Sequence, residues 1–430
     1  MNVDLIVASS IFIIFISAVF FYLFGFQKQV PSWQSLIELR KKAADLMNEI
    51  LAQGKPENWE KENVLPSKIG LASSAYLIPI LISDASGYNR INEPIAQEIV
   101  FDEDCRNIAW NGTIRIFDEN FNEIPFKFVN QTFCPSGFLQ KAILFFELNV
   151  PANSTRKLQI FFYNSTQVKP KDYGNFSSLV LWLKFDEGSG NMVYDYSGNG
   201  NNGHIYGASW VDGKVKKALN FDGVDDYVNV SNFIGSFTQL TIEAWIYPRN
   251  YSNYRKIIDF GGDYGGGVGR RFTLQLAVDG IDVDLDGGLS GLAKWFSTPM
   301  NQWLHLVGTW NGTSFIRLYV NGEIKAENTQ SPNITTLSIL SSDAHIVGRR
   351  ITAIDYFNGT IDEVKIYNRV LTDEEIFSHY QQPLSVKIFP KTQVSLISFE
   401  KIEALRNISY DLLKDVLQKG YDFRIEVYEK

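Results

Sequence analysis

Three aspartates, Asp282, Asp284 and Asp286, occupy alternate positions in the run IDVDLD. Successive side chains of a β-strand point to opposite faces, so this spacing places all three carboxylates on one side of a predicted strand. Grouped carboxylates can contact a sugar, bind calcium, or supply the two acids of a glycoside hydrolase, one of which needs a raised pKa and a cleft. A water-exposed strand face without a ligand is the alternative.

Two aromatic residues in predicted loops near these aspartates, Tyr264 and Trp295, have flat rings that can stack on a sugar. Packing inside a turn or against the core is the alternative for both. The glycine-rich run 261–269 lacks the Gly-Lys-Ser/Thr sequence of a phosphate-binding loop, and the four histidines lack a zinc-ligand spacing. The sequence therefore predicts a flexible hairpin loop there and no zinc site.

The composition predicts a globular, β-rich protein that does not bind nucleic acid. The chain has 430 residues, which suits two or three domains, and 14% of them are aromatic. It carries 40 basic and 48 acidic side chains, a net charge of −8, and no basic patch longer than Arg40-Lys41-Lys42. A short basic run of this kind is typical of a solvated helix face.

The chain has two cysteines, Cys105 and Cys134, in one predicted β region. We expect them to form a disulfide in an exported protein, and two free core thiols are the alternative.

The segment Leu5–Phe26 is a predicted membrane anchor, because its 22 residues carry no charge and are long enough to cross the hydrocarbon core. Lys28 and Arg40-Lys41-Lys42 follow it, which by the positive-inside rule would place the rest of the chain in the cytoplasm. Eleven Asn-x-Ser/Thr triplets favour the opposite orientation, an extracellular glycosylated body. The triplets begin at Asn111, Asn130, Asn153, Asn164, Asn175, Asn229, Asn250, Asn311, Asn333, Asn358 and Asn407.

The stretch Leu179–Tyr227 alternates short apolar and aromatic runs with turns of Gly, Asn, Asp and Ser, which is typical of an all-β sandwich. Its succession of VLWLKFDEGSG, DYSGNGNNG and ALNFDGVDDY resembles the opening of laminin-G-like, concanavalin-A-like jelly-roll domains. The later runs LTIEAWIYP, the hairpin around Asn321-Gly322 and IDEVKIYNRVLTDEEI continue the resemblance over residues 175–382. Thr372 and Glu375 form a predicted capping box that opens a short helix.

The resemblance implies a recognition domain with no enzymatic activity, since the E-x-D-x-x-E motif of the related glycosidases is absent. It also implies calcium as a cofactor, because many such domains bind it through oxygen ligands in turns. Turn capping by the same side chains is the alternative. The residues in these turns are Asp186, Asp195, Asn199, Asp222, Asp225 and Asp362.

The remaining segments predict a second, smaller β-sandwich on a helical stem. Six predicted strands at regular spacing place a β domain at residues 75–170. An amphipathic helix and connector fill residues 29–74 after the anchor of residues 1–28, and a helix and strand in 383–430 are expected to pack on that stem. The stem resembles archaeal pilin-like membrane proteins in Leu39, Ala44, Leu46, Gly54, Pro56, Asn58, Trp59, the run 69–72 and Phe423 to Val427.

Together these features predict a single-pass membrane protein with an extracellular body that binds carbohydrate or a cell-surface protein, as in adhesion. The N-terminal helix would contact lipid and would also provide a route to self-assembly. The alternative is a structural, minor pilin-like or envelope subunit without a ligand, although the residues MNVD before the span differ from those of a processed pilin. Hydrolysis of a glycoside is the third and least supported function.

Overall fold

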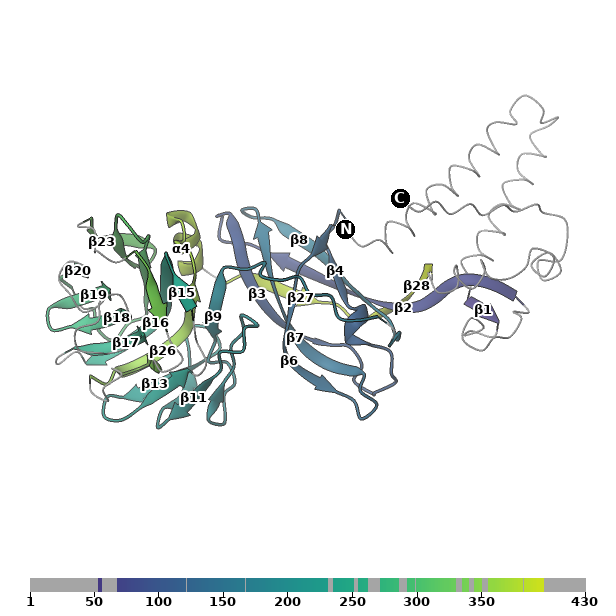
Figure 1. Cartoon of the computed structure of the whole chain (residues 1–430), viewed down its shortest axis with the longest axis horizontal. Helices are drawn as coiled ribbons and strands as arrows, with labels where there is room; N and C mark the ends of the chain where they lie inside the picture. The colour runs from purple at the N-terminus through teal and green to yellow at the C-terminus, as the bar shows by residue number, and fades with distance from the viewer. Residues whose placement is uncertain are drawn as a thin grey trace, which may run out of the picture.

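The structure is a computed structural model, and it describes residues 53–55, 68–120, 122–166, 168–230, 235–250, 254–261, 271–285, 292–297, 299–329, 335–339, 344–349, 355–381 and 383–397. The predicted anchor, stem helix and C-terminal helix lie outside these residues, as do Tyr264, Asp286, Asn333 and Asn407. Within the described part of the chain, no helix is long and apolar enough to cross a membrane. The described residues are mainly β and form two sandwiches (Figure 1).

The first sandwich packs a three-stranded sheet, which we call sheet B, against a sheet around the long strand β2 (Lys68–Ser83), which we call sheet A. Buried side chains such as Ile80, Phe101, Leu144 and Phe162 fill the space between them. The six strands predicted between residues 75 and 165 are present. Sheet B has the order β3 (Arg90–Val100), β7 (Leu139–Val150), β6 (Lys127–Phe133), and sheet A contains β1 (Gln53–Lys55), β2, β8 (Thr155–Phe162), β4 (Arg115–Phe117) and β5 (Glu123–Ile124).

The chain returns to this first sandwich after it has completed the second one. The strands β27 (Ser385–Ile388) and β28 (Thr392–Ile397) both pair antiparallel with β2. Lys391, between them, donates a hydrogen bond of 2.8 Å to the backbone oxygen of Phe101. The second sandwich is therefore an insertion between β8 and β27.

The second sandwich consists of two eight-stranded sheets in the described residues, called here sheet C and sheet D. Sheet C contains β9 (Leu179–Leu183), β12 (Ser209–Asp212), β13 (Lys217–Asp222), β26 (Asn358–Tyr367), β16 (Leu240–Asn250), β21 (Leu304–Trp310), β22 (Ile316–Val320) and β23 (Glu323–Asn328). Sheet D has the order β10 (Met192–Val193), β11 (Gly203–Tyr206), β14 (Tyr227–Val230), β25 (Ala344–Val347), β17 (Arg255–Gly261), β18 (Arg271–Ala277), β19 (Gly280–Leu285), β20 (Leu292–Trp295).

Local sequence explains the ends of several elements in the second sandwich. The predicted Asn321-Gly322 turn joins β22 to β23, and both residues have positive φ, 53° and 81°, as a two-residue hairpin of this kind requires. The predicted capping box is present at the start of helix α4 (Asp373–Tyr380). Thr372 accepts from the backbone N–H of Glu375, and the carboxylate of Glu375 accepts from the backbone N–H of Thr372.

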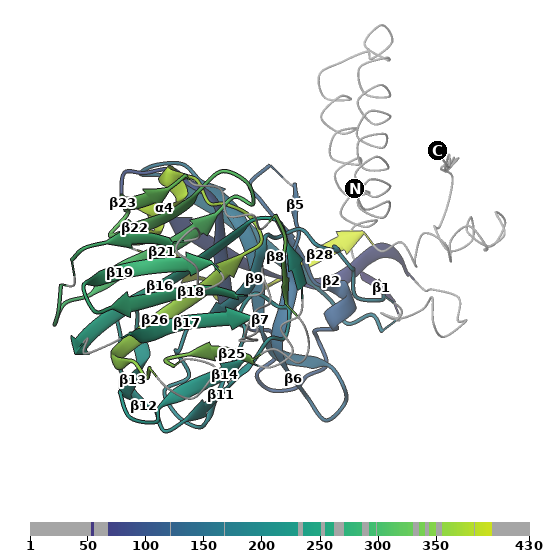
Figure 2. The same ribbon diagram turned by 60° about the vertical axis from the view of Figure 1, so that its left-hand side comes forward.

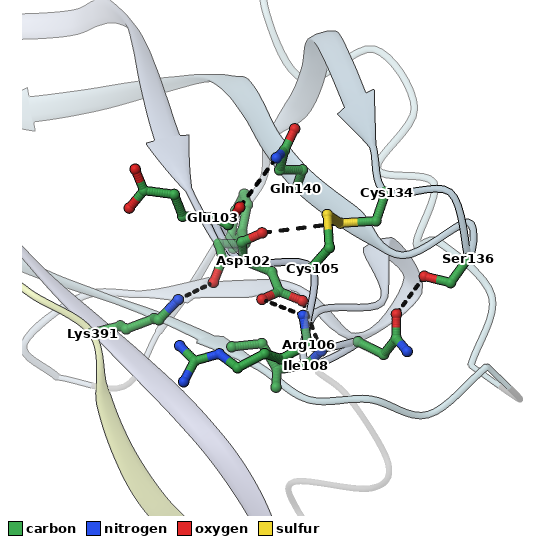
Figure 3. The surroundings of a disulfide bond; sticks show 11 residues. Asp102, Glu103, Cys105, Arg106, Ile108, Cys134, Ser136, Gln140 and Lys391 are labelled. Atoms are coloured by element: carbon green, nitrogen blue, oxygen red, sulfur yellow. Dashed lines mark hydrogen bonds between the residues drawn. A yellow bond between two sulfur atoms is a disulfide. The ribbon is translucent and has the colours of Figure 1, made fainter.

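The predicted disulfide between Cys105 and Cys134 is present, with a Cα–Cα distance of 5.6 Å (Figure 3). It joins the loop after β3 to the turn after β6. The carboxylate of Asp102 accepts hydrogen bonds from the backbone N–H groups of Arg106, at 3.0 Å, and Ile108, at 3.1 Å. The loop is therefore held at one end of the first sandwich by a covalent bond and a capping carboxylate.

The outer face of sheet C packs against helix α4 and against sheet B of the first sandwich. Phe145 of β7, Trp182 of β9, Tyr319 of β22 and Tyr367 of β26 belong to one buried apolar cluster across this boundary. At its edge, the rings of Tyr88 and Phe377 meet edge to face at 4.8 Å, and Arg90 of β3 donates to the backbone oxygen of Ser378.

A buried ionic network lies beside this apolar cluster. The carboxylate of Glu243 lies 3.1 Å from His305 Nε2, 3.3 Å from Lys365 Nζ and 2.9 Å from His379 Nδ1. The other ring nitrogen of His379 lies 3.7 Å from a carboxylate oxygen of Glu93 in the first sandwich. Polar contacts as well as apolar ones therefore join the two sandwiches.

Candidate ligand-binding face

The outward-facing side of sheet D carries polar side chains on β17, β18 and β19. On β18, Phe272, Leu274 and Leu276 point into the core, so Thr273 and Gln275 point outward. Strand register aligns Lys256, Gln275, Asp282 and Lys294 across four strands, and Asp259, Thr273 and Asp284 across three. Asp282 and Asp284 therefore share one face of β19, as their alternation predicts.

The charged half of this row is buried and internally hydrogen-bonded. Asp282 is only 1% exposed, so the solvated-face alternative is wrong for this residue. Its carboxylate accepts a 2.6 Å hydrogen bond from Gln275, whose side-chain oxygen accepts from Lys256. Burial raises the pKa of Asp282 to about 6, and burial, together with Arg271, lowers the pKa of Lys256 to about 8.

A second set of buried hydrogen bonds lies next to the first. Arg271 donates to Asp259 at 2.7 Å and to Thr273 at 3.0 Å, and the Thr273 hydroxyl donates to the same Asp259 oxygen at 2.8 Å. These contacts keep the side chains in fixed positions on the sheet.

Trp295 does not join the aspartate row. Its strand partner across the ladder is Ile281, a core residue, whereas Asp282 pairs with Lys294. Trp295 packs against the core of the sandwich, with Lys325 Nζ 5.9 Å from its ring centre. The packing alternative is therefore correct for Trp295, and a shared ligand site with Asp282 is not supported.

The exposed half of the outward face is an aromatic ladder on β11 and β14, which the sequence analysis did not single out. Tyr206 and Tyr227 are cross-strand partners with nearly parallel rings 4.5 Å apart. The ring of His204 lies 4.6 Å from that of Tyr206, and the guanidinium of Arg349 lies 3.9 Å from the ring centre of Tyr227. The sequence did contain a signal for this ladder. His204 and Tyr206 alternate with Gly203 and Ile205, which are buried, and Tyr227 precedes the buried Val228.

A comparison with known protein families gives a match within the second sandwich. Residues 222–377 match the concanavalin A-like lectin/glucanases superfamily. The match lies inside residues 175–382, where the sequence resemblance was found, and it leaves the first sandwich unassigned. A comparison with curated proteins finds no match.

Solved structures similar to the concanavalin A-like domain include domain 4 of a GH43 extracellular arabinanase from Geobacillus stearothermophilus, in complex with arabinotriose. It has 20% identity and a TM-score of 0.38, covering 48% of this chain and 99% of that one. The binding domain of botulinum neurotoxin serotype G has 16% identity and a TM-score of 0.39, and the match covers 47% of this chain and 50% of that one. The binding domain of Paraclostridial Mosquitocidal Protein 1 has 18% identity and a TM-score of 0.37, and the match covers 47% of this chain and 52% of that one. The chain thus spans about half the length of these toxin domains.

The six predicted calcium ligands in the concanavalin A-like domain are divided among three places. Asp195 and Asn199 stabilise a turn: Asp195 accepts from the backbone N–H groups of Trp182, Ser197 and Asn201, and Lys127 donates to the side-chain oxygen of Asn199 at 2.9 Å. Turn capping, the alternative, describes Asp195, whereas Asn199 is hydrogen-bonded to Lys127 of the first sandwich and to the backbone oxygen of Leu179.

Asp222 and Asp225 belong to a second group, together with Asp226, which the sequence analysis missed. The carboxylates of these three residues lie within 4.8 Å of one another. Asp222 also caps its own turn by accepting from the backbone N–H of Val224 at 2.7 Å. Gly207 approaches the group so closely that a Cβ there would lie 2.0 Å from Asp226 Oδ1.

Asp186 and Asp362 form the third group, near the loop between β12 and β13. Asp362 is fully buried and accepts from the backbone N–H of Val215 at 2.9 Å. Burial and the neighbouring carboxylates of Glu363 and Asp186 hold its pKa well above its usual range. Lys184 and Lys216 each lie 3.4 Å from the Asp186 carboxylate. The six residues therefore do not fit a single calcium site, and calcium binding stays a prediction for the Asp222 group alone.

Proposed function

We propose that the concanavalin A-like domain is a non-catalytic carbohydrate-binding module and that sheet D is its binding face. The observation behind this proposal is that sheet C is covered, whereas sheet D exposes side chains on β11 and β14, although most outward side chains of its strands β17, β18 and β19 are buried. Sheet C is covered by helix α4 and the first sandwich, with its Trp182, Tyr319 and Tyr367 in a buried cluster. Sheet D lies on the opposite side of the domain, and its strands β18 and β19 lie far from β1 and β28 in Figures 1 and 2.

The chemistry of the accessible part of sheet D favours a ligand with many hydroxyl groups. Tyr206 is 41% exposed, and His204, Tyr227 and Asn229 are half-buried beside it. The Tyr206 and Tyr227 rings stack on each other, Tyr206 also contacts His204 and Tyr227 contacts Arg349, so a ligand would meet mainly the ring edges and the hydroxyls. Phenol, imidazole and amide groups together donate and accept hydrogen bonds, as the recognition of sugar hydroxyls requires.

The geometry of Asp282 favours binding over hydrolysis. A glycosidase needs a carboxyl group that reaches the glycosidic oxygen and a second one on the other side of the bond. Asp282 is 1% exposed and its carboxylate accepts a hydrogen bond from Gln275, so the fold does not present this carboxylate to a ligand.

Replacing Tyr206 by alanine is the direct test of this face. We expect the full chain to bind a subset of glycans on an array, and Tyr206→Ala to weaken that binding at least about tenfold, the equivalent of about 1.4 kcal/mol. Ile324→Ala is a matched control, because Ile324 is 43% exposed but lies on the edge strand β23 of sheet C. Failure of the full chain to bind any glycan, or equal weakening by both variants, would exclude this face as a lectin site and favour the structural alternative.

We further propose that residues 5–26 anchor the protein and that both sandwiches lie outside the cell. In this orientation the exposed triplets are the best glycan acceptors: Asn130, Asn153, Asn164, Asn175 and Asn250. The side chains of Asn311 and Asn358 are engaged in hydrogen bonds within the fold, and Asn111 and Asn229 are half-buried. Mass spectrometry of the protein from its natural source should find glycans mainly on the first five, and unmodified asparagine at all five would contradict the extracellular orientation.

A further inference from the structure

Three side chains with complementary reactivity stand in register on neighbouring strands of sheet D. Lys256 of β17 is the cross-strand partner of Gln275 of β18, and Gln275 is the cross-strand partner of Asp282 of β19. Side chains directly opposite each other on antiparallel strands have Cβ atoms only about 5 Å apart. An amine, a carboxamide and a carboxyl group are therefore placed side by side by the backbone itself.

The contacts between these groups follow the order of an amide-forming reaction. Lys256 Nζ donates to the carboxamide oxygen of Gln275, so the amine lies against the carbonyl group. On the other side, Gln275 Nε2 donates to Asp282 Oδ1 at 2.6 Å. The nitrogen that a nucleophile would displace is thus hydrogen-bonded to the one carboxyl group of the three.

Burial moves the pKa values of the amine and of the carboxyl group toward neutral pH. The exposed fractions of Lys256, Gln275 and Asp282 are 5%, 4% and 1%. Burial lowers the pKa of Lys256 to about 8, which makes its neutral, nucleophilic form accessible near neutral pH. Burial also raises the pKa of Asp282 to about 6, close to the value suited to proton transfer. The other charged groups near Lys256 are Asp259, Arg271 and Asp284.

We propose that Lys256 and Gln275 join in an intramolecular isopeptide bond and that Asp282 transfers the proton in this step. The neutral Nζ of Lys256 attacks the side-chain carbonyl carbon of Gln275 and forms the new carbon–nitrogen bond. The bond from that carbon to Nε2 then breaks, and Nε2 leaves as ammonia. Asp282 gives its proton to the departing nitrogen and takes one from the attacking nitrogen, so it ends in its starting state.

The reaction needs no other participant. A primary amide and an amine become a secondary amide and ammonia, with no oxidant, reductant or activated co-reactant. Holding two reacting groups in contact raises their effective concentration to about 10⁵ M or more in well-oriented intramolecular reactions. The bond has to form only once in the life of the molecule, so slow chemistry suffices. The product would tie β17 to β18 covalently inside the sandwich.

Peptide mapping of the full chain by mass spectrometry tests the proposal. After reduction of the disulfide, the intact chain should be lighter than its sequence by one ammonia. An Asn-Gly pair that closes to a succinimide gives the same mass change, so the linked peptide is decisive. Cleavage after arginine and lysine should yield a branched product that joins residues 256–270 to residues 272–294, with no cut after Lys256. Recovery of residues 257–270 and 272–294 as separate, unmodified peptides would overturn the proposal.

Two variants assign the roles. Lys256→Arg should abolish the ammonia loss and the branched peptide, because a guanidinium is not a nucleophile at these pH values. Asp282→Asn should slow cross-linking at least about tenfold in a folded chain, since general acid–base groups contribute factors of this order or larger. Lys294→Arg is the matched control, because Lys294 is the cross-strand partner of Asp282 but donates its hydrogen bond to Asp279. Cross-linking that persists unchanged in Asp282→Asn would show that Asp282 has no part in the step.

Discussion

The substitution Glu243→Gln is expected to lower the free energy of unfolding by about 3–5 kcal/mol, because it removes the charge on which a buried ionic network depends. Glu243 is fully buried and lies within 3.3 Å of His305, Lys365 and His379. Without its carboxylate, the ammonium of Lys365 would remain buried without its closest anionic partner. Denaturant titration of the full chain measures the loss.

The same residue makes the stability dependent on pH. Burial alone would raise the pKa of Glu243, but His379, Lys365 and His305 outweigh it and hold this pKa well below its usual range. A carboxyl group whose pKa is lower in the folded state than in the unfolded state stabilises the fold. This contribution is complete above the pKa in the unfolded state, about 4.3, and is lost as the pH falls through the pKa in the folded state. Burial lowers the pKa of His305, which acts in the same direction. The Glu243→Gln variant should therefore show a flatter decline of stability in acid than the parent.

Glu323→Gln is the matched control for this prediction. Glu323 also lies on sheet C and contacts a lysine, Lys325, at 2.6 Å, but it is exposed to solvent. Exposed ion pairs contribute little, so the free energy of unfolding of Glu323→Gln should remain that of the parent chain. Equal free energies of unfolding for Glu243→Gln and Glu323→Gln would contradict the role given to the buried network.

The double substitution Cys105→Ser, Cys134→Ser is expected to destabilise the first sandwich by about 3–4 kcal/mol, since the bond closes a long loop of the unfolded chain. The two cysteines are 29 residues apart in the sequence. Chemical denaturation of the parent, with and without a reducing agent, should show the same difference as the double variant. Unfolding at the same denaturant concentration in all three samples would mean that the bond does not stabilise the fold.

Ser136→Ala serves as the control for the disulfide. Ser136 is exposed, lies in the same turn as Cys134 and donates to Asn107 in the adjoining loop. Its removal should change the stability by less than about 0.5 kcal/mol, as for most surface substitutions. Glycan binding should survive in the reduced protein below its unfolding transition, because the proposed face on Tyr206 and Tyr227 belongs to the other sandwich.

Local patterns in the sequence were sufficient for most of the secondary structure. Alternating apolar residues predicted the strands of both sandwiches, Asn321-Gly322 predicted a hairpin turn, and Thr372 with Glu375 predicted the helix start. These features depend on backbone preferences and on neighbours within a few residues, so one segment contains all the information they need. The disulfide was predictable because only two cysteines were available.

The candidate sites were less predictable, because they depend on which strands become neighbours. Alternation correctly placed Asp282 and Asp284 on one face, but it did not show that Asp282 would be buried against Gln275. The calcium prediction grouped residues by their presence in turns, and the fold separates those turns. The aromatic ladder was missed because Tyr206 and Tyr227 meet only when β11 pairs with β14.

The aspartates of IDVDLD show most clearly where the sequence is sufficient and where it is not. The sequence alone determined that Asp282 and Asp284 share a face, since side-chain direction on a strand has a period of two residues. Only the tertiary structure decided that this face meets Lys256 and Gln275, because strand order and register bring together residues 26 positions apart, from 256 to 282. The same packing removes water from the three groups, and desolvation is what shifts the pKa values of Lys256 and Asp282.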